Sequence, residues 1–358
     1  MALLQTTLSP NNEAESPSRK SLEAGGRYPA SLPLEKHKAL IVTGSLMSNP
    51  YDRELTRDDV SPVQIIYDDV VRTAPFFQDF GALGISSFAF PISPSDPDTA
   101  FFSTGNDIVS VDVNHQSNTT HTIGNTLLDV HEINFKEDRL LIANTGRDEI
   151  VIYSTNESRV CSAIPLSRFR AHSHHPAPES TEQVLDHFHV NQAFSGIDGH
   201  IHALVHHVQG HQLLRKVIGG VVKSHGDGGV LNLDTGAAID LRLNAPHSIR
   251  IYRDQYVLLN SGVCEMVLYS NRWQKLQTFP TGGWGRGLAI ESDTAYVGIS
   301  PIRKRYQPFL RRLTGEPSIA AIDLQTGRLI DRLALRFMEQ VNNVYCVDRA
   351  VAEALCVL

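Results

Sequence analysis

The feature that most constrains the fold is a unit of four short segments that occurs twice with matching lengths and turns. The first copy spans residues 131–164 and the second spans residues 247–279. All four segments of each copy are rich in aliphatic, β-branched and aromatic residues, a composition typical of β-strands. Asn144–Gly146 and Asn260–Gly262 fall at the same turn, where we expect Gly or Asn to adopt positive φ and close a hairpin. A repeated four-strand unit predicts the blade of a β-propeller.

Three more copies can be placed along the chain. They span about residues 85–123, 187–243 and 286–335, and the second contains a long insertion rich in Gly and His. No long stretch shows the 3.6-residue period of an amphipathic helix. The chain is therefore predicted to be all-β.

The last unit is incomplete. Only Asn343–Val347 and Ala354–Leu358 read as strands there, and two further strands are available at residues 39–43 and 63–67. Joining both pairs in one blade closes the ring and removes a sheet edge that would otherwise be open to aggregation. We expect a six-bladed propeller in which N- and C-terminal strands share one blade.

Composition sets the domain boundaries. Residues 1–35 are rich in Ser, Pro, Asn and Glu and show little periodicity, so we expect a disordered tail. Residues 36–358 are predicted to form a single propeller domain, and a hydrophobic content of 41% is sufficient for its core.

Charge and hydropathy exclude several classes of partner. The net charge is −7 and Lys and Arg form no long run, so no nucleic-acid surface is expected. No window approaches the roughly 18 apolar residues of a membrane span, and no signal peptide is recognisable. We therefore expect no membrane association and a cytoplasmic location.

The four cysteines are far apart, without a CxxC pair, and are expected to be free thiols.

A polar residue begins the predicted first strand of every blade. Aligned by their apolar positions, these residues are Ser86, His131, His189, His247, Arg286 and Asn343. The three histidines are 58 residues apart at both steps. The innermost strand of each blade lines the central channel of a propeller, so these side chains are expected to converge at the channel mouth.

Three converging imidazoles suggest a metal site. His131, His189 and His247 are predicted to bind one divalent ion, zinc or iron, with one coordination position left open. Such an ion acts as a Lewis acid or lowers the pKa of its water. The competing interpretation is that the histidines only bind water or backbone carbonyls and join the blades.

Arg286 is the candidate anion-binding group. Its two-pronged guanidinium suits a carboxylate or phosphate, so we expect a small anionic substrate. The predicted substrate-binding residues are Arg286, Ser86, Trp284 and Arg250. The predicted catalytic residues are Arg286, Tyr345 and Asn343.

Other histidines are assigned structural roles. His200 and His202 share one face of a predicted strand, with His206 and His207 just beyond it. This pattern favours a satisfied polar strand face. His187 is an alternative ligand to His189 if the strand register is shifted by two residues.

Several short segments of the chain resemble those of a known family. They include His131-Glu-Ile133, Pro246–Arg250, Leu259–Gly262 and Arg286-Gly-Leu288. With these segments the chain resembles uncharacterised bacterial β-propellers of the NHL-like superfamily over most of residues 80–350. Members typically have a Cys-His pair where this chain has Phe188-His189. The resemblance implies a fold and a shared site, but no reaction.

A looser similarity is to peptidyl-hydroxyglycine amidating lyase, a six-bladed propeller with a histidine-bound catalytic zinc in its channel.

The sequence supports two functional hypotheses. The first is a metal-dependent lyase, isomerase or hydrolase that acts on a small anionic metabolite at the channel mouth. The alternative is a non-catalytic propeller that binds a ligand or a protein partner, which an exposed aromatic patch around Trp273 and Trp284 would favour.

Overall fold

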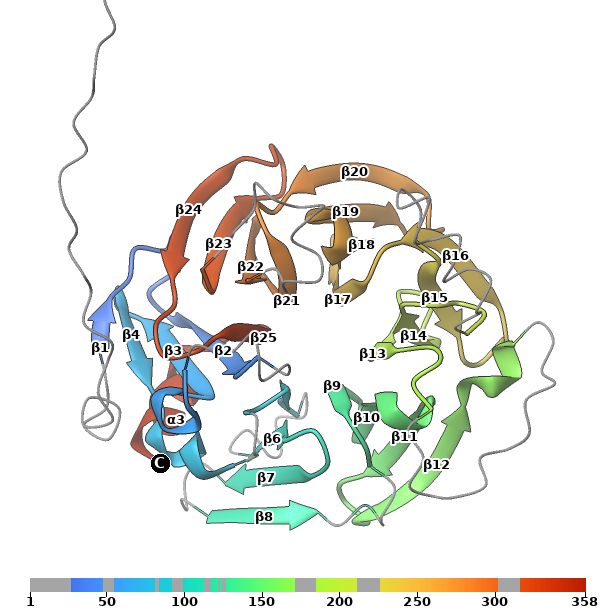
Figure 1. Cartoon of the computed structure of the whole chain (residues 1–358), viewed down its shortest axis with the longest axis horizontal. Coiled ribbons are helices and arrows are strands. Elements are labelled where there is room, and N and C mark those ends of the chain that lie inside the picture. The colour runs from blue at the N-terminus through green and yellow to red at the C-terminus, as the bar shows by residue number, and fades with distance from the viewer. Residues whose placement is uncertain are drawn as a thin grey trace, which may run out of the picture.

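The strands form six sheets arranged as blades around a central channel (Figure 1). The computed structural model describes residues 27–47, 55–80, 84–91, 99–112, 117–121, 123, 127–170, 185–210, 226–301 and 316–358. The six-bladed propeller predicted from the repeats is confirmed. Residues 1–26 of the predicted tail and residues 211–225 of the insertion lie outside the described part of the chain.

Five blades have four antiparallel strands each. One contains β5 (Ser87–Ala89), β6 (Thr99–Ser103), β7 (Ile108–Asp112) and β8 (Ser117–His121). The next contains β9 (Val130–Lys136), β10 (Arg139–Asn144), β11 (Glu149–Ser154) and β12 (Arg159–Pro165). It is followed by β13 (Val190–Ser195), β14 (Ile201–Val205), β15 (Gly228–Asn232) and β16 (Ala238–Leu243).

The remaining four-stranded blades follow in chain order. They contain β17 (Pro246–Tyr252), β18 (Gln255–Asn260), β19 (Glu265–Ser270) and β20 (Lys275–Pro280), then β21 (Trp284–Glu291), β22 (Thr294–Ser300), β23 (Ser318–Asp323) and β24 (Leu329–Ala334).

The sixth blade closes the ring. Its strand order is β1-β4-β3-β2-β25, with β1 (Arg27–Pro29), β2 (Lys38–Ser45), β3 (Val63–Tyr67), β4 (Val70–Thr73) and β25 (Gln340–Asp348). The C-terminal strand β25 pairs with β2 from Lys38 opposite Asp348 to Ser45 opposite Gln340. The shared blade is therefore confirmed. Strand β1 lies inside the segment predicted as a disordered tail, and it is ordered there by pairing with β4.

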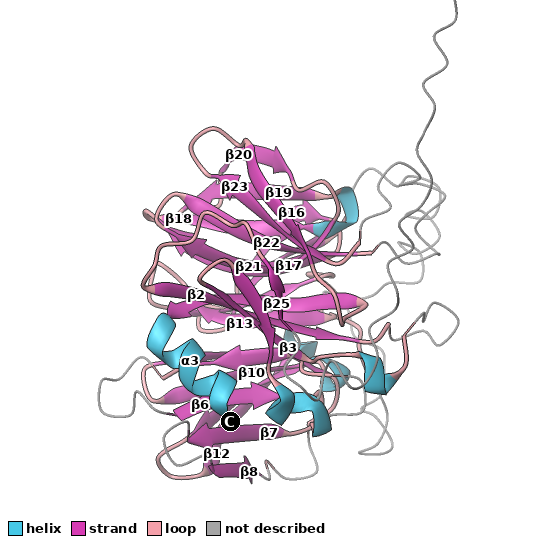
Figure 2. Cartoon of the chain, turned by 90° about the vertical axis from the view of Figure 1, so that its left-hand side faces the viewer, coloured by secondary structure: helices cyan, strands magenta, loops and turns pink. Residues whose placement is uncertain are grey.

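The prediction of a strand at Ala354–Leu358 is wrong. Residues Arg349–Val357 form helix α3, which lies against the closing blade (Figure 2). The segment contains three alanines, the best helix former. Its spacing also places Ala352 and Leu355 on one face, where both are fully buried against residues of β2 and β3. Among the described residues no helix is long and apolar enough to span a membrane.

Short 3-10 helices, η5 (Thr145–Arg147) and η7 (Ser261–Val263), occupy the two turns in which we expected positive φ at glycine. Three further 3-10 helices are η2 (Arg57–Asp59), η3 (Pro75–Asp79) and η6 (Leu166–Phe169). The left-handed residue after η5 is Asp148 (φ 51°) and that after η7 is Cys264 (φ 58°). Gly146 is required for space instead, because a Cβ there would lie 2.8 Å from the Leu128 carbonyl oxygen.

The core lies between neighbouring blades. Leu141 and Ala143 of β10, for example, pack with Ala203 and Val205 of β14, and all four are fully buried. Because each blade packs against two others, its second strand is apolar on both faces. The four cysteines are free.

Candidate functional site

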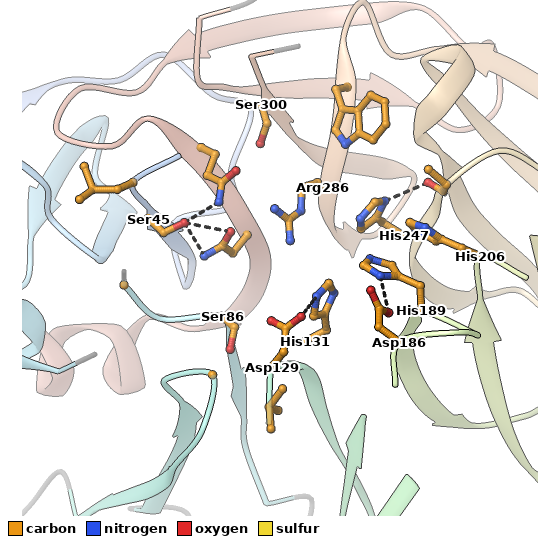
Figure 3. A pocket seen from close by; sticks show the side chains of 18 of the residues that line it. Ser45, Ser86, Asp129, His131, Asp186, His189, His206, His247, Arg286 and Ser300 are labelled. Atoms are coloured by element: carbon orange, nitrogen blue, oxygen red, sulfur yellow. Dashed lines mark hydrogen bonds and ion pairs between the residues drawn. The ribbon is translucent and has the colours of Figure 1, made fainter. Parts of the chain in front are cut away.

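A pocket of about 450 Å³ lies at one end of the channel, where all six innermost strands begin. Pockets of this volume suit small molecules. The labelled residues that line it are Ser45, Ser86, Asp129, His131, Asp186, His189, His206, His247, Arg286 and Ser300 (Figure 3). Five of the six residues predicted to form a polar ring are therefore brought together, and Trp284 lies with them.

The sixth predicted ring residue, Asn343, does not line the pocket. Its neighbour Asn342 does, together with Gln340 at the start of β25. The buried Asn343 side chain accepts a hydrogen bond from Arg250 at 3.3 Å. Successive side chains of a strand point to different sides, so an error of one residue in alignment exchanges a pocket residue for a buried one.

Strand register separates His189 from the other two histidines. Val130, Val190 and Pro246 each pair with the last residue of the second strand of their blade. His131 and His247 follow Val130 and Pro246, and the residue that follows Val190 is Asn191. The equal spacing of 58 residues is therefore a coincidence of loop lengths.

His189 instead occupies the position directly before its strand. Its backbone is left-handed, with φ 47°, as in Asp129 (φ 53°) and Ala245 (φ 49°) at the matching positions. Left-handed conformations are uncommon outside glycine, so their recurrence at one position in three blades marks a shared turn. His189 therefore enters the pocket from the turn before its strand, whereas His131 and His247 enter it from within their strands.

Each predicted metal ligand has its Nδ1 fixed by an oxygen atom. The distances are 2.8 Å from His131 to Asn191 Oδ1, 2.8 Å from His189 to Asp186 Oδ1, and 3.0 Å from His247 to the Ala245 carbonyl oxygen. A carbonyl or carboxylate oxygen only accepts, so Nδ1 must carry the proton in all three rings. In a neutral imidazole this leaves Nε2 with its lone pair.

Four ionisable residues that line the pocket were not predicted as site residues, namely Asp129, Asp186, His207 and His206. Of these, His206 is the imidazole that contacts two of the predicted histidines. Its ring centroid lies 4.2 Å from that of His189 and 5.3 Å from that of His247. It follows β14 directly, and the pairing of Val190 with Val205 places it beside His189 across the hairpin. This pairing is the signal that was available. A residue that follows the second strand of a blade lies beside the residue that precedes the first.

Burial keeps several of the imidazoles neutral. It lowers the pKa of His206 and of His247 well below the ordinary value, and the positive charge of Arg286 adds to the effect at His247. Burial also lowers the pKa of His189, although Asp186 opposes this. Neutral imidazoles are the form that binds a metal ion.

Asp129 supplies negative charge at the rim. Its carboxylate lies 3.5 Å from His131 Nε2. That contact, with further positive potential from Arg286, lowers the pKa of Asp129 to about 2 although 60% of its side chain is exposed. The pocket therefore combines a guanidinium, two carboxylates and neutral imidazoles.

Two residues predicted to bind or react with substrate lie elsewhere. Arg250 forms an ion pair with the buried Glu132 at 3.0 Å, deeper in the channel than His247. The Tyr345 hydroxyl donates to Ser87 Oγ at 3.0 Å and accepts from the Phe88 N–H at 2.9 Å. Neither residue lines the pocket. The sequence placed them at the channel mouth because strand position alone does not give depth along the channel.

Whether the pocket suits a metal ion depends on its imidazole nitrogens. His206 Nε2 is buried and has no hydrogen-bond partner among the described residues. Such an orphaned nitrogen costs free energy unless a ligand or ion satisfies it. The imidazoles of the pocket are not yet gathered around one point, because within the described ranges Glu35, His37 and Glu291 are the only trio whose ligand atoms all lie within 4.8 Å of one another. The residue types fit a metal, and binding requires the rings to approach.

The fold and the site together define a six-bladed β-propeller with a histidine-lined pocket at one end of its channel. A family model described as "Domain of unknown function (DUF4915)" matches residues 106–353. The chain belongs to this family. No curated protein matches the sequence.

Solved structures share the fold at low sequence identity. A propeller in the crystal structure of a nidogen/laminin complex has a TM-score of 0.52 and 10% identity, covering 86% of this chain and 98% of that chain. A streptogramin B lyase structure has a TM-score of 0.42 and 15% identity, covering 70% and 69%. The first similarity supports the propeller fold alone, and the second is too low to bear on function.

Proposed function

We propose that the channel-mouth pocket binds a small anionic metabolite and, with a divalent metal ion, catalyses a lyase, isomerase or hydrolase reaction. The observation that carries the proposal is the convergence of five imidazoles and one guanidinium among the described residues of a single pocket. Convergent polar groups in a well-formed concave pocket are the usual mark of an active site.

Arg286 is assigned to the anion. It is the single Arg or Lys among the lining residues that the structure describes, and its guanidinium points towards the middle of the pocket (Figure 3). A carboxylate or phosphate there gains charge-assisted hydrogen bonds from the guanidinium. The hydroxyls of Ser45, Ser86 and Ser300 surround the same space and favour a polar ligand.

The channel histidines are assigned to the metal ion. Their neutral Nε2 atoms are donors of the type found in catalytic three-histidine sites. When bound, the ion would supply Lewis acidity and an activated water. The chain's own contribution is to hold the imidazoles in one tautomer through Asn191, Asp186 and Ala245, which preorganises the donors.

The anion assignment is tested by thermal shift with phosphate and malonate as probes. Wild-type protein is expected to gain thermal stability with either probe, and Arg286→Gln to lose the gain. Arg272→Gln is the matched control, since Arg272 is an exposed arginine that does not line the pocket. An equal gain in Arg286→Gln and wild type would refute the assignment.

The metal assignment is tested by elemental analysis of protein purified without an affinity tag. We expect about one zinc or iron per chain, and a clear loss in His247→Ala. Absence of metal from wild-type protein, together with no uptake on dialysis against Zn²⁺ or Fe²⁺, would refute it and leave a metal-free binding pocket.

The scaffold alternative lacks a specific supporting observation. Trp273 is stacked on Tyr256 with ring centroids 4.1 Å apart, and Trp284 lines the pocket. The two tryptophans therefore have different surroundings, and these contacts do not supply the exposed aromatic patch that would favour this alternative.

A further inference from the structure

We propose that His206 is the central metal ligand of the pocket, flanked by His189 and His247, and that His131 is not a ligand. This inference rests on the proposed metal dependence and changes the ligand set predicted from the sequence. It also names a residue that the sequence pattern assigned to a structural role.

His206 is the imidazole that contacts both other proposed ligands. Its ring centroid lies 4.2 Å from that of His189 and 5.3 Å from that of His247. The His131 ring lies 4.9 Å from that of His189, and among the described residues it has no ring contact with His206 or His247. Figure 3 shows the three imidazoles on one side of the pocket, opposite the space reached by Arg286. His206 is therefore the imidazole best placed to complete a site with both His189 and His247.

The contacts of its ring nitrogens distinguish His131 from His189, His206 and His247. His131 has contacts at both ring nitrogens, to Asn191 at 2.8 Å and to Asp129 at 3.5 Å. His189 and His247 are held by described residues through Nδ1 only. His206 Nε2 is buried without any partner among the described residues. Donors for an ion are thus available from His189, His206 and His247 without breaking a contact.

The strand pairing explains why these residues meet. The hairpin of β13 and β14 is closed at the pocket end by Val190 and Val205, and the His206 N–H donates to the His189 carbonyl oxygen at 3.2 Å. The corresponding residue of the neighbouring blade is Ser261, whose hydroxyl lies 3.0 Å from His247 Nδ1. One blade therefore supplies two ligands and the next supplies one ligand and the group that orients it.

The experiment is a titration of the metal-free, full-length protein with Co²⁺, followed by visible absorption. All variants carry His37→Ala, so that the surface trio of Glu35, His37 and Glu291 does not contribute. We expect His206→Ala to weaken Co²⁺ binding by more than about 10-fold, the scale on which even outer-shell substitutions act. His131→Ala is expected to weaken Co²⁺ binding clearly less than His206→Ala, because His131 is not a ligand. The partly exposed His200 provides the control His200→Ala.

His206→Cys keeps the inference testable if His206→Ala does not fold. A thiolate bound to Co²⁺ adds a charge-transfer band in the near ultraviolet, which no merely structural role of His206 produces. The band in this variant supports direct ligation. Unchanged affinity in a folded His206→Ala protein, or a loss confined to His131→Ala, would overturn the inference and leave the proposed metal dependence intact. No Co²⁺ binding by wild-type protein would overturn both.

Discussion

Glu132 on β9 and Arg250 on β17 form an ion pair at 3.0 Å between two blades that are not neighbours in the ring. The blade of β13 lies between them. Arg250 also reaches Asn343 on β25, so these contacts join alternate blades below the pocket. The side chains are 5% and 21% exposed, which makes them a buried network and not a surface pair.

Replacing Arg250 tests the importance of this network for stability. In Arg250→Met the Glu132 carboxylate stays buried without its partner, and we expect the free energy of unfolding to fall by about 3 kcal/mol. Urea unfolding measures the change. The double variant with Glu132→Gln is expected to recover part of the loss, because no buried charge remains. A loss in the double variant equal to the sum of the single losses would contradict a coupled pair.

The buried imidazoles predict acid sensitivity of the metal-free protein. Burial holds the pKa values of His206 and His247 well below the ordinary value of 6.5. Neighbouring histidines add to the effect at His206, and Arg286 with neighbouring histidines adds to it at His247. The unfolded chain therefore binds protons that the folded chain does not, and stability is full above pH 6.5 and falls as the pH drops below it. Each histidine contributes up to about 1.4 kcal/mol per pH unit.

Urea midpoints at pH 7.5, 6.5 and 5.5, measured with a chelator present, give this slope. His206→Asn is expected to reduce this slope, whereas His200→Asn, at a partly exposed histidine, is expected to leave it unchanged. A midpoint that rises on acidification would show that the imidazoles are not buried in neutral form.

Asp148 is predicted to position the segment before β13. Its buried carboxylate accepts the N–H groups of His187 at 2.9 Å and Phe188 at 2.8 Å, next to Asp186 and His189. In Asp148→Ala we expect Co²⁺ affinity to fall about 10-fold or more, as for other supporting residues of metal sites. The exposed Asp138 provides the control Asp138→Ala. Wild-type affinity in a folded Asp148→Ala protein would rule out the positioning role.

Helix α3 is predicted to stabilise the closing blade. Leu355 is fully buried against that blade, whereas 67% of Val357 is exposed. We expect Leu355→Ala to cost about 2–4 kcal/mol of unfolding free energy and Val357→Ala less than about 0.5 kcal/mol. Thermal and urea unfolding measure both. Equal effects of the two substitutions would mean that the helix does not pack as described.

The fold was predictable because each blade repeats the same local pattern. Runs such as Leu140–Ala143 and Tyr256–Leu259 are buried on both faces, so their composition identifies them as strands wherever they lie. The closing blade was predictable because the C-terminal unit was incomplete. Helix α3 was missed because Ala354–Leu358 is a short apolar run, which periodicity alone does not assign to helix or strand.

The sequence by itself determined the number of blades, the closure of the ring and the convergence of polar side chains at one end of the channel. Those features depend on local composition and on a repeat that can be counted. Only the tertiary structure decided which polar side chains meet. A left-handed turn before β13 shifts His189 relative to His131 and His247, and strand pairing brings His206 beside it. Register and depth along the channel depend on contacts between segments distant in sequence, and a shift of one residue turns a side chain to another side of the strand.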